Sequence, residues 1–337
     1  MRSVILERNK LVGRKVARWF AATGATAVPV DDPGQVAAAL DETVADLLCA
    51  DTFDGDLVAE CIRARPGLRG LLWTAEPLRR SLRYVAESAR IDNVLGRRDF
   101  ESPPRAREVV MVARRIAGAA KRRPPHDDPG AGRSGDPSSG RSNDPTGAHA
   151  PGLAAYLDWG FTGFELDVRS SRERDDAVAR IADGVHALAV PRRVGEMFGE
   201  LAHELLMNAM YDAPVDAHGR PRFAGDRKAD IVLDDGERAT VRFGTDGSRL
   251  ALQVRDPFGR LERHHVVDGL ARGLAGGEMD RAHGGAGLGM MVCHNSSSAM
   301  FFDVVRGRHT EVTALFELDL NLREFRTQAR SLHFWSR

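Results

Sequence analysis

The chain has 337 residues, of which 42% are hydrophobic and 28% charged, which favours packed cores and argues against global disorder. Lys and Arg total 48, as do Asp and Glu, so the net charge of zero argues against a general binder of nucleic acid or anionic membranes. The three cysteines lack paired spacing, which excludes a disulfide scaffold and a cysteine zinc site.

No apolar run reaches the roughly 18 residues that a membrane span needs. The first ten residues become charged too soon for a signal peptide. We therefore expect a cytoplasmic protein with no membrane partner and no direct nucleic-acid partner.

The first 118 residues alternate apolar runs with amphipathic segments. Short apolar runs predict strands at 3–6, 25–30, 45–50, 68–74 and 91–95. Helical periodicity follows them at 11–22, 33–40, 56–64, 77–86 and 105–116. Strand–helix units in this order predict an α/β fold whose first part is a flavodoxin-like, doubly wound parallel sheet. Ligands of such sheets bind at the carboxyl ends of the strands.

Those strand ends carry Glu7, Asp51, Thr74 and Arg97. Their order resembles the response-regulator receiver domains, in which an acidic pair binds magnesium, an aspartate accepts phosphate, a Thr or Ser switches and a Lys pairs with the phosphate. The resemblance makes Asp51 the candidate phospho-acceptor. Arg8 follows Glu7, so one carboxylate is missing, and Arg97 stands at the lysine position. We expect a degenerate receiver-like domain, with a working receiver as the alternative; without the resemblance, Asp51 is a helix N-cap.

Residues 121–152 are rich in Pro, Gly, Ser and Asp and lack large apolar side chains. Such a stretch cannot bury enough surface to offset the entropy of ordering, so it predicts a flexible linker. We therefore divide the chain into a receiver-like domain (1–118), a linker (119–152) and a second domain (153–337).

The second domain begins with a predicted strand at 164–170 and a helix at 172–188. In the next predicted helix, 194–214, polar residues recur at every fourth position as Glu200, Glu204, Asn208 and Asp212. This stripe places a carboxylate one turn before a carboxamide. By itself it is also typical of a solvated helix face.

Two further segments follow the helix. A hairpin is predicted from 239–243 and 250–254, and its second strand ends in Asp256-Pro257-Phe258-Gly259. A glycine cluster spans 283–290 and leads into an apolar segment, an arrangement in which backbone N–H groups and a helix N-terminus can approach an anion.

Taken together, E-L-L-M-N-A, D-P-F-G and G-G-A-G-L-G-M resemble the Bergerat-fold ATPases, the superfamily of gyrase, Hsp90, histidine kinases and MutL. The resemblance spans roughly 163–320, with 306–318 as its closing strands. It implies a two-layer α+β sandwich that binds ATP and Mg²⁺. Asn208 then holds the magnesium ion, Glu204 is the catalytic base, and Asp212 belongs to the nucleotide-binding residues.

The resemblance also implies roles for the loops. Asp256 accepts a hydrogen bond from the adenine amino group, and Gly259 lets the loop pass close to the base. Thr310 is the adenine-side threonine, with Thr313 as the second candidate. Residues 260–284 form a lid, and the phosphate cradle comprises Gly285, Gly287, Leu288 and Gly289. Glycines that the family has two and four residues after the aspartate are replaced here by Phe258 and Arg260.

Among these ATPases, the compact order is similar to the anti-sigma-factor serine kinases. That similarity implies transfer of phosphate from ATP to a regulatory protein partner, anti-anti-sigma-like or sigma-like, under control of the receiver-like domain. A nucleotide-gated binding module without transfer and a histidine-kinase-like transducer remain alternatives. The segment 215–228 is an insertion relative to that family. The aromatic tail 331–337 either packs on its own domain or forms a homodimer contact.

Overall fold

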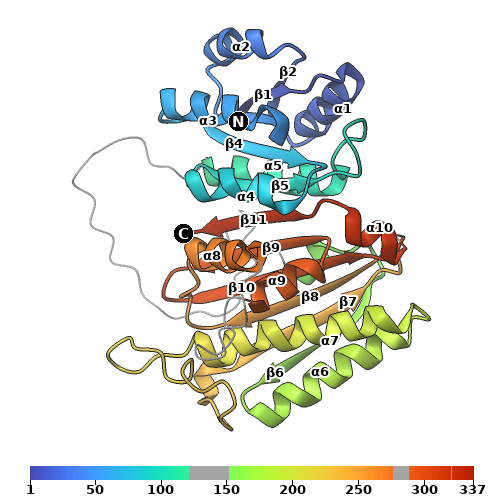
Figure 1. Cartoon of the computed structure of the whole chain (residues 1–337), viewed down its shortest axis with the longest axis vertical. Coiled ribbons are helices and arrows are strands. Elements are labelled where there is room, and N and C mark those ends of the chain that lie inside the picture. The colour runs from blue at the N-terminus through green and yellow to red at the C-terminus, as the bar shows by residue number, and fades with distance from the viewer. Residues whose placement is uncertain (121–151, 276–287, 320) are drawn as a thin grey trace.

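The computed structural model describes residues 1–120, 152–275, 288–319 and 321–337, and within them one 11-stranded sheet runs through the molecule (Figure 1). The strand order is β2-β1-β3-β4-β5-β11-β9-β10-β8-β7-β6. The linker prediction for 121–152 falls almost entirely outside the described residues. No described helix has the length and hydropathy that crossing a membrane requires.

The first half of the sheet is parallel. Its strands are β1 (Arg2–Leu6), β2 (Thr26–Val30), β3 (Leu47–Asp51), β4 (Arg69–Thr74) and β5 (Ile91–Gly96). Its helices are α1 (Lys10–Ala21), α2 (Val36–Thr43), α3 (Gly55–Ala64), α4 (Leu78–Glu87) and α5 (Ala106–Ala120). The order 2-1-3-4-5 is flavodoxin-like, as predicted. Every residue of β3 is buried, as expected for a central strand covered on both faces.

The second half of the sheet is antiparallel, except that β11 pairs in parallel with β9. Its strands are β6 (Thr162–Val168), β7 (Ala239–Thr245), β8 (Arg249–Asp256), β9 (Ala299–Val305), β10 (His309–Glu317) and β11 (Ser331–Ser336). Its helices are α6 (Ser171–His186), α7 (Arg192–Met207), α8 (Arg263–Leu274), α9 (Leu288–Asn295) and α10 (Leu322–Thr327). The chain is therefore mixed α/β throughout. The predicted helix at 172–188 and hairpin at 239–254 are confirmed within a few residues.

Two apolar layers hold the helices to this half of the sheet. Side chains of α6, α7, α8 and α9 pack on one face in the large core that includes Phe198, Phe243 and Phe316. Tyr156 and Phe301 belong to a smaller core on the other face, which Met111 of α5 also contacts. Figure 1 shows α6 and α7 lying along the sheet below α8 and α9.

The helix predicted over 194–214 changes character at its end. After α7 the chain widens into a π-helical turn, η4 (Asn208–Asp212), which the Ala213 N–H closes on the Asn208 carbonyl oxygen at 3.0 Å. Such single wide turns recur at functional sites because they re-aim side chains. The even four-residue stripe of the sequence is therefore interrupted at Asn208.

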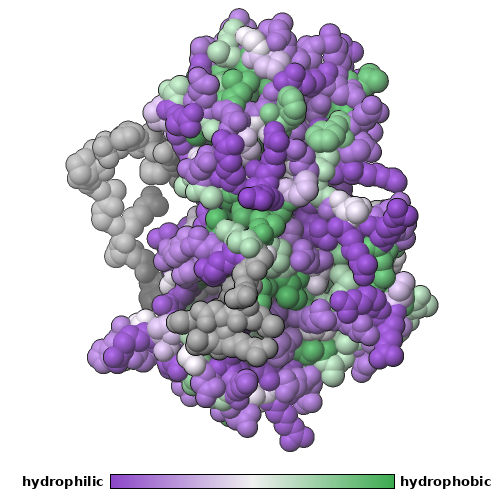
Figure 2. All heavy atoms as spheres, in the orientation of Figure 1, coloured by the Kyte–Doolittle hydropathy of each residue, from purple (hydrophilic) through white to green (hydrophobic). Residues whose placement is uncertain are grey.

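The tail joins the two halves of the sheet. β11 pairs antiparallel with β5 through Leu332 and His333, and parallel with β9 along its whole length. The His333 ring bridges Asn93 and Glu108, at 3.0 Å and 2.9 Å. Of the two alternatives for 331–337, the structure shows packing within its own chain. The face drawn in Figure 2 is mostly hydrophilic, with hydrophobic residues also visible near the level of this junction.

Candidate functional site

A cavity of about 350 Å³ lies between η4, the ends of β8 and β10, and α8. Its wall contains four of the residues singled out from the sequence, Asn208, Asp212, Asp256 and Thr310, which come from three distant segments. The cavity is within the size range of small-molecule sites. Thr313 lies three residues after Thr310 on the same strand, on the opposite face, where its hydroxyl accepts a hydrogen bond from Gln253 at 2.9 Å.

Asp256 is the last residue of β8 and is 6% exposed. Burial raises the pKa of its carboxyl group to about 6, although hydrogen bonds from the backbone N–H groups of Phe258 and Gly259 act in the opposite direction. Thr310 faces Asp256 across the β8–β10 pair, and its buried hydroxyl lies close enough to that carboxyl group to lower its pKa. The wall therefore offers a carboxylate acceptor with a hydroxyl beside it.

Gly259 sits where the chain leaves β8. Its φ of +63° is in the left-handed region, and a Cβ there would lie 2.1 Å from the Val305 carbonyl oxygen. Its own carbonyl oxygen accepts a hydrogen bond from the Gly307 N–H at 3.2 Å. Glycine is required here because the loop packs against the β9–β10 turn. The closeness of this loop to an adenine base stays a prediction.

Arg227 meets the polar end of α7 and η4. Its Nη2 donates to Asn208 Oδ1 at 3.3 Å and lies 3.5 Å from Asp212 Oδ2 and 3.9 Å from Glu204 Oε2. Burial raises the pKa of Asp212, which the Arg227 charge opposes. No sequence motif assigned a role to Arg227. It lies in the segment 215–228, an insertion relative to the serine kinases that the chain resembles, so the only signal was a basic residue within that insertion.

This arrangement tests the predicted magnesium ligand. The side-chain oxygen of Asn208 accepts a hydrogen bond from Arg227, whose positive charge therefore stands where a divalent cation would bind and repels it. Among the described residues no group of three or more acidic, histidine or cysteine side chains could hold a metal ion. As arranged, these side chains do not fit a divalent cation, and the magnesium assignment stays a prediction.

The first turn of α9 lies against Glu204, the candidate catalytic base. A Cβ on Gly289 would lie 2.1 Å from Glu204 Oε2, so the carboxylate rests against the first turn of α9. Leu288 is the first residue of this helix. Gly285 and Gly287 lie outside the described residues. The predicted lid contains α8, which contributes His265, Asp268 and Arg272 to the cavity wall.

The strand ends of the first half form a second polar cluster. Arg97 pairs with Glu7 Oε2 at 3.0 Å and with Asp51 Oδ2 at 2.7 Å, and all three side chains are almost fully buried. Burial raises the pKa of Asp51, and the Arg97 charge counteracts this effect. Thr74 accepts a hydrogen bond from the Thr52 hydroxyl at 2.9 Å. Arg97 thus lies between the two carboxylates. The receiver resemblance implies that a magnesium ion and a phosphate bind in this space.

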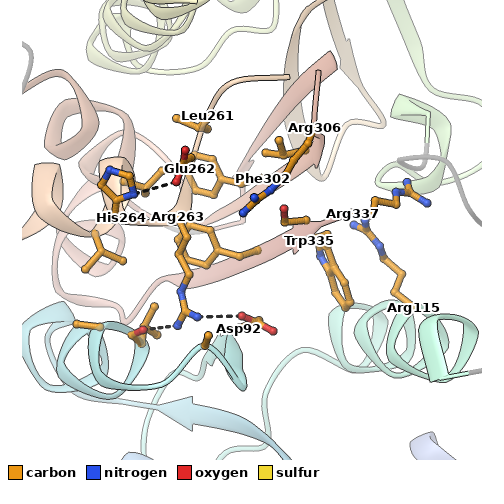
Figure 3. Close-up of a pocket in the computed structure, with 18 of the residues that line it drawn as sticks. Asp92, Arg115, Leu261, Glu262, Arg263, His264, Phe302, Arg306, Trp335 and Arg337 are labelled. Atoms are coloured by element: carbon orange, nitrogen blue, oxygen red, sulfur yellow. Dashed lines mark hydrogen bonds and ion pairs between the residues drawn. The ribbon is translucent and has the colours of Figure 1, made fainter. Parts of the chain in front are cut away.

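A larger cavity, about 730 Å³, lies where the two halves meet, and Figure 3 shows its side chains. Arg263, at the start of α8, crosses it. Its Nη1 donates to Asp92 at 3.1 Å, and its Nη2 donates to the carbonyl oxygens of Val85, Ser88 and Ile91. α8 therefore borders both cavities and is fastened to the end of α4.

No family model matches the sequence, and no curated protein matches it. Solved structures do match. A response regulator receiver domain protein (CheY-like) from Methanospirillum hungatei aligns at 14% identity and a TM-score of 0.31, over 36% of this chain and 95% of its own. A CheY-like protein (tadZ) from Pseudomonas aeruginosa aligns at 21% identity and a TM-score of 0.29, over 38% of this chain and 98% of its own. A putative pilus assembly-related protein from Burkholderia pseudomallei aligns at 19% identity and a TM-score of 0.29, over 35% of this chain and 89% of its own.

Proposed function

We propose that the second half of the chain is a Bergerat-type domain whose 350 Å³ cavity binds an adenine nucleotide. One observation carries the proposal. Asn208, Asp256 and Thr310 are separated by dozens of residues, yet they line the same cavity. A coincidental set of a polar helix and a turn has no reason to converge on one cavity.

The base end of the nucleotide lies against Asp256 and Thr310 in this proposal. The adenine amino group donates to the Asp256 carboxylate, which is mostly ionised at neutral pH because its pKa is about 6. The Thr310 hydroxyl, which lies beside that carboxylate in the cavity wall, contacts the ring edge. A site built to pair with an amino group rejects a base that lacks one, because its buried acceptor would then be unpaired.

The phosphate end lies at η4 and the start of α9. We propose that Glu204, whose side chain is 25% exposed, orients the hydroxyl of a regulatory partner protein for phosphoryl transfer. Transfer of this kind depends mainly on positioning and charge neutralisation, for which a carboxylate and nearby donors suffice. No step of the proposal uses magnesium, because Asn208 is engaged by Arg227.

A second function, nucleotide-gated binding without transfer, is favoured by a specific contact. The Arg227 side chain lies between Glu204 and Asp212, so it restrains the proposed base. The signalling role of the first half belongs to both functions. There we propose a receiver-like regulatory domain that acts through the α4–α8 contact rather than through efficient phosphorylation of Asp51, because Arg97 already neutralises that carboxylate.

Calorimetric titration with ATP tests binding, using the intact chain, Asp256→Asn and Asn208→Ala. We expect both variants to lose affinity, Asp256→Asn for adenosine as well as ATP. GTP serves as the control, because guanine carries no amino group at the corresponding position. Equal affinity for ATP in all three proteins contradicts the proposal. Incubation with γ-labelled ATP then separates transfer, which leaves the label on a protein hydroxyl, from gating, which leaves it on ATP, and Glu204→Ala should abolish the labelling.

A further inference from the structure

The Arg227 guanidinium occupies the centre of the polar cluster at the end of α7. Asn208, Asp212 and Glu204 all lie within 4 Å of its Nη2, and the arginine side chain is only 12% exposed. A cation placed among one carboxamide and two carboxylates does there what a bound metal ion does elsewhere, which is to offset their negative charge.

The segment that carries Arg227 is anchored on both sides. Arg222 forms a two-bond pair with Glu237, at 3.0 Å and 2.8 Å. The Tyr211 hydroxyl donates to the Ala229 carbonyl oxygen at 2.8 Å, and the Tyr211 and Phe223 rings meet edge to face. One anchor, Tyr211, comes from η4, which lines the cavity, and the other, Glu237, ends the short turn η5 (Asp235–Glu237) before β7. The position of Arg227 is therefore fixed relative to the cavity wall.

Arg227 also has donor capacity that its present contacts leave unused. A guanidinium group has five N–H donors, and the contacts to the cluster all use Nη2. Its Nε is buried and has no hydrogen-bond partner. A phosphate oxygen satisfies such donors in pairs, which is the geometry in which arginine binds phosphate best.

We infer that Arg227, which lies behind the wall residues Asn208 and Asp212, is the phosphate-binding cation beside this cavity and replaces the divalent ion that Asn208 would otherwise hold. The inference rests on the proposed function. When a nucleotide enters, the free donors of Arg227 bind its phosphates while Nη2 keeps Glu204 and Asp212 neutralised. Without Arg227 the two carboxylates repel the polyphosphate, and a divalent ion becomes necessary.

The experiment is calorimetric titration of the full chain with ATP, once with a chelator and once with Mg²⁺. The variants are Arg227→Ala and Arg227→Lys. Arg220→Ala is the matched control, because Arg220 lies in the same segment but is exposed and pairs only with Asp216. Thermal unfolding of each variant shows whether it is folded, and adenosine titration shows whether the base end is intact.

We expect the wild type and Arg220→Ala to bind ATP equally well with and without Mg²⁺. Arg227→Ala should lose roughly ten- to a hundredfold in ATP affinity in the chelator, regain it with Mg²⁺ and bind adenosine normally. Arg227→Lys should fall between them. Two results would overturn this inference but leave the proposed function standing. One is a wild type that needs Mg²⁺ to bind ATP, and the other is an Arg227→Ala variant that binds ATP as tightly as wild type in the chelator. Failure of the wild type to bind adenosine or ATP in either buffer overturns the proposed function too.

Discussion

Arg263 of α8 and Asp92 of β5 form an ion pair, 3.1 Å between Nη1 and Oδ1, that connects the two halves of the chain across 171 residues (Figure 3). Asp92 also pairs with Arg69, at 2.6 Å. Burial lowers the pKa of Arg263, and the Asp92 charge opposes this effect. The same guanidinium caps carbonyl oxygens at the end of α4, where a helix favours a positive charge.

Replacing Arg263 by Ala should therefore weaken the junction. The change leaves Asp92 with one partner and several carbonyl oxygens with none, so we expect a loss of about 2–3 kcal/mol in the free energy of unfolding. Urea denaturation measures it. Arg272→Ala, an exposed arginine on the same helix, is the control and should change stability by less than about 0.5 kcal/mol. Equal effects of the two substitutions would show that the junction does not depend on Arg263.

The raised pKa of Asp256 predicts how adenosine affinity depends on pH. The adenine amino group needs the ionised carboxylate, so affinity should be constant above the pKa of about 6 and fall toward tenfold per pH unit below it. Titrations between pH 5 and pH 8 measure the effect. Asp256→Asn has no such ionisation, and a pH profile that is the same in both proteins contradicts the assignment.

The same pKa makes a prediction about stability. The folded protein holds the Asp256 proton more tightly than the unfolded chain, whose pKa is near 3.8, so the stabilisation present below pH 4 is lost as pH rises through about 6. Asp256→Asn should then be more stable than wild type above pH 6, by up to about 3 kcal/mol, with the difference vanishing near pH 4. Denaturation at both pH values is the measurement, and a constant difference would count against a raised pKa.

Arg97 should be essential for the folded state of the first half. Removing it leaves Glu7 and Asp51 buried without a counter-charge, which costs about 3–5 kcal/mol. We expect Arg97→Ala to lower the urea midpoint strongly. The control is Arg98→Ala, which should change the urea midpoint little because the Arg98 side chain is 73% exposed. Comparable midpoints for Arg97→Ala and Arg98→Ala would mean that the triad contributes nothing to stability.

Two glycine-to-alanine substitutions should behave differently. At Gly259 the added Cβ meets backbone atoms and φ is positive, so Gly259→Ala should destabilise the chain by about 2 kcal/mol or more. At Gly289 the Cβ meets only the movable end of Glu204, so Gly289→Ala should fold normally but displace that carboxylate. Unfolding curves and the transfer of label from γ-labelled ATP to protein measure the two effects. A Gly289→Ala protein with unchanged labelling of protein argues against a role for Glu204 as base.

Local patterns in the sequence were sufficient for much of the fold. The apolar runs and helical periodicities of the first 118 residues predict each strand and helix of the flavodoxin-like half, because these signals depend on neighbours a few residues apart. Strand ends in a parallel sheet share one edge, so the proximity of Glu7, Asp51 and Arg97 also followed from order alone. The shared cavity of Asn208 and Asp256 did not follow from local pattern, and only the resemblance to the Bergerat-fold ATPases led us to expect it.

Tertiary structure decided what depends on long-range contacts. The sequence does not show that the tail forms β11, because its partner β5 lies about 240 residues earlier and pairing leaves no local signature. It equally does not show that Arg227 lies among Asn208, Asp212 and Glu204, where a cation was expected. A charged side chain in a loop has the same local pattern whether it is solvated or buried against carboxylates, and only the folded chain fixes which of these it is.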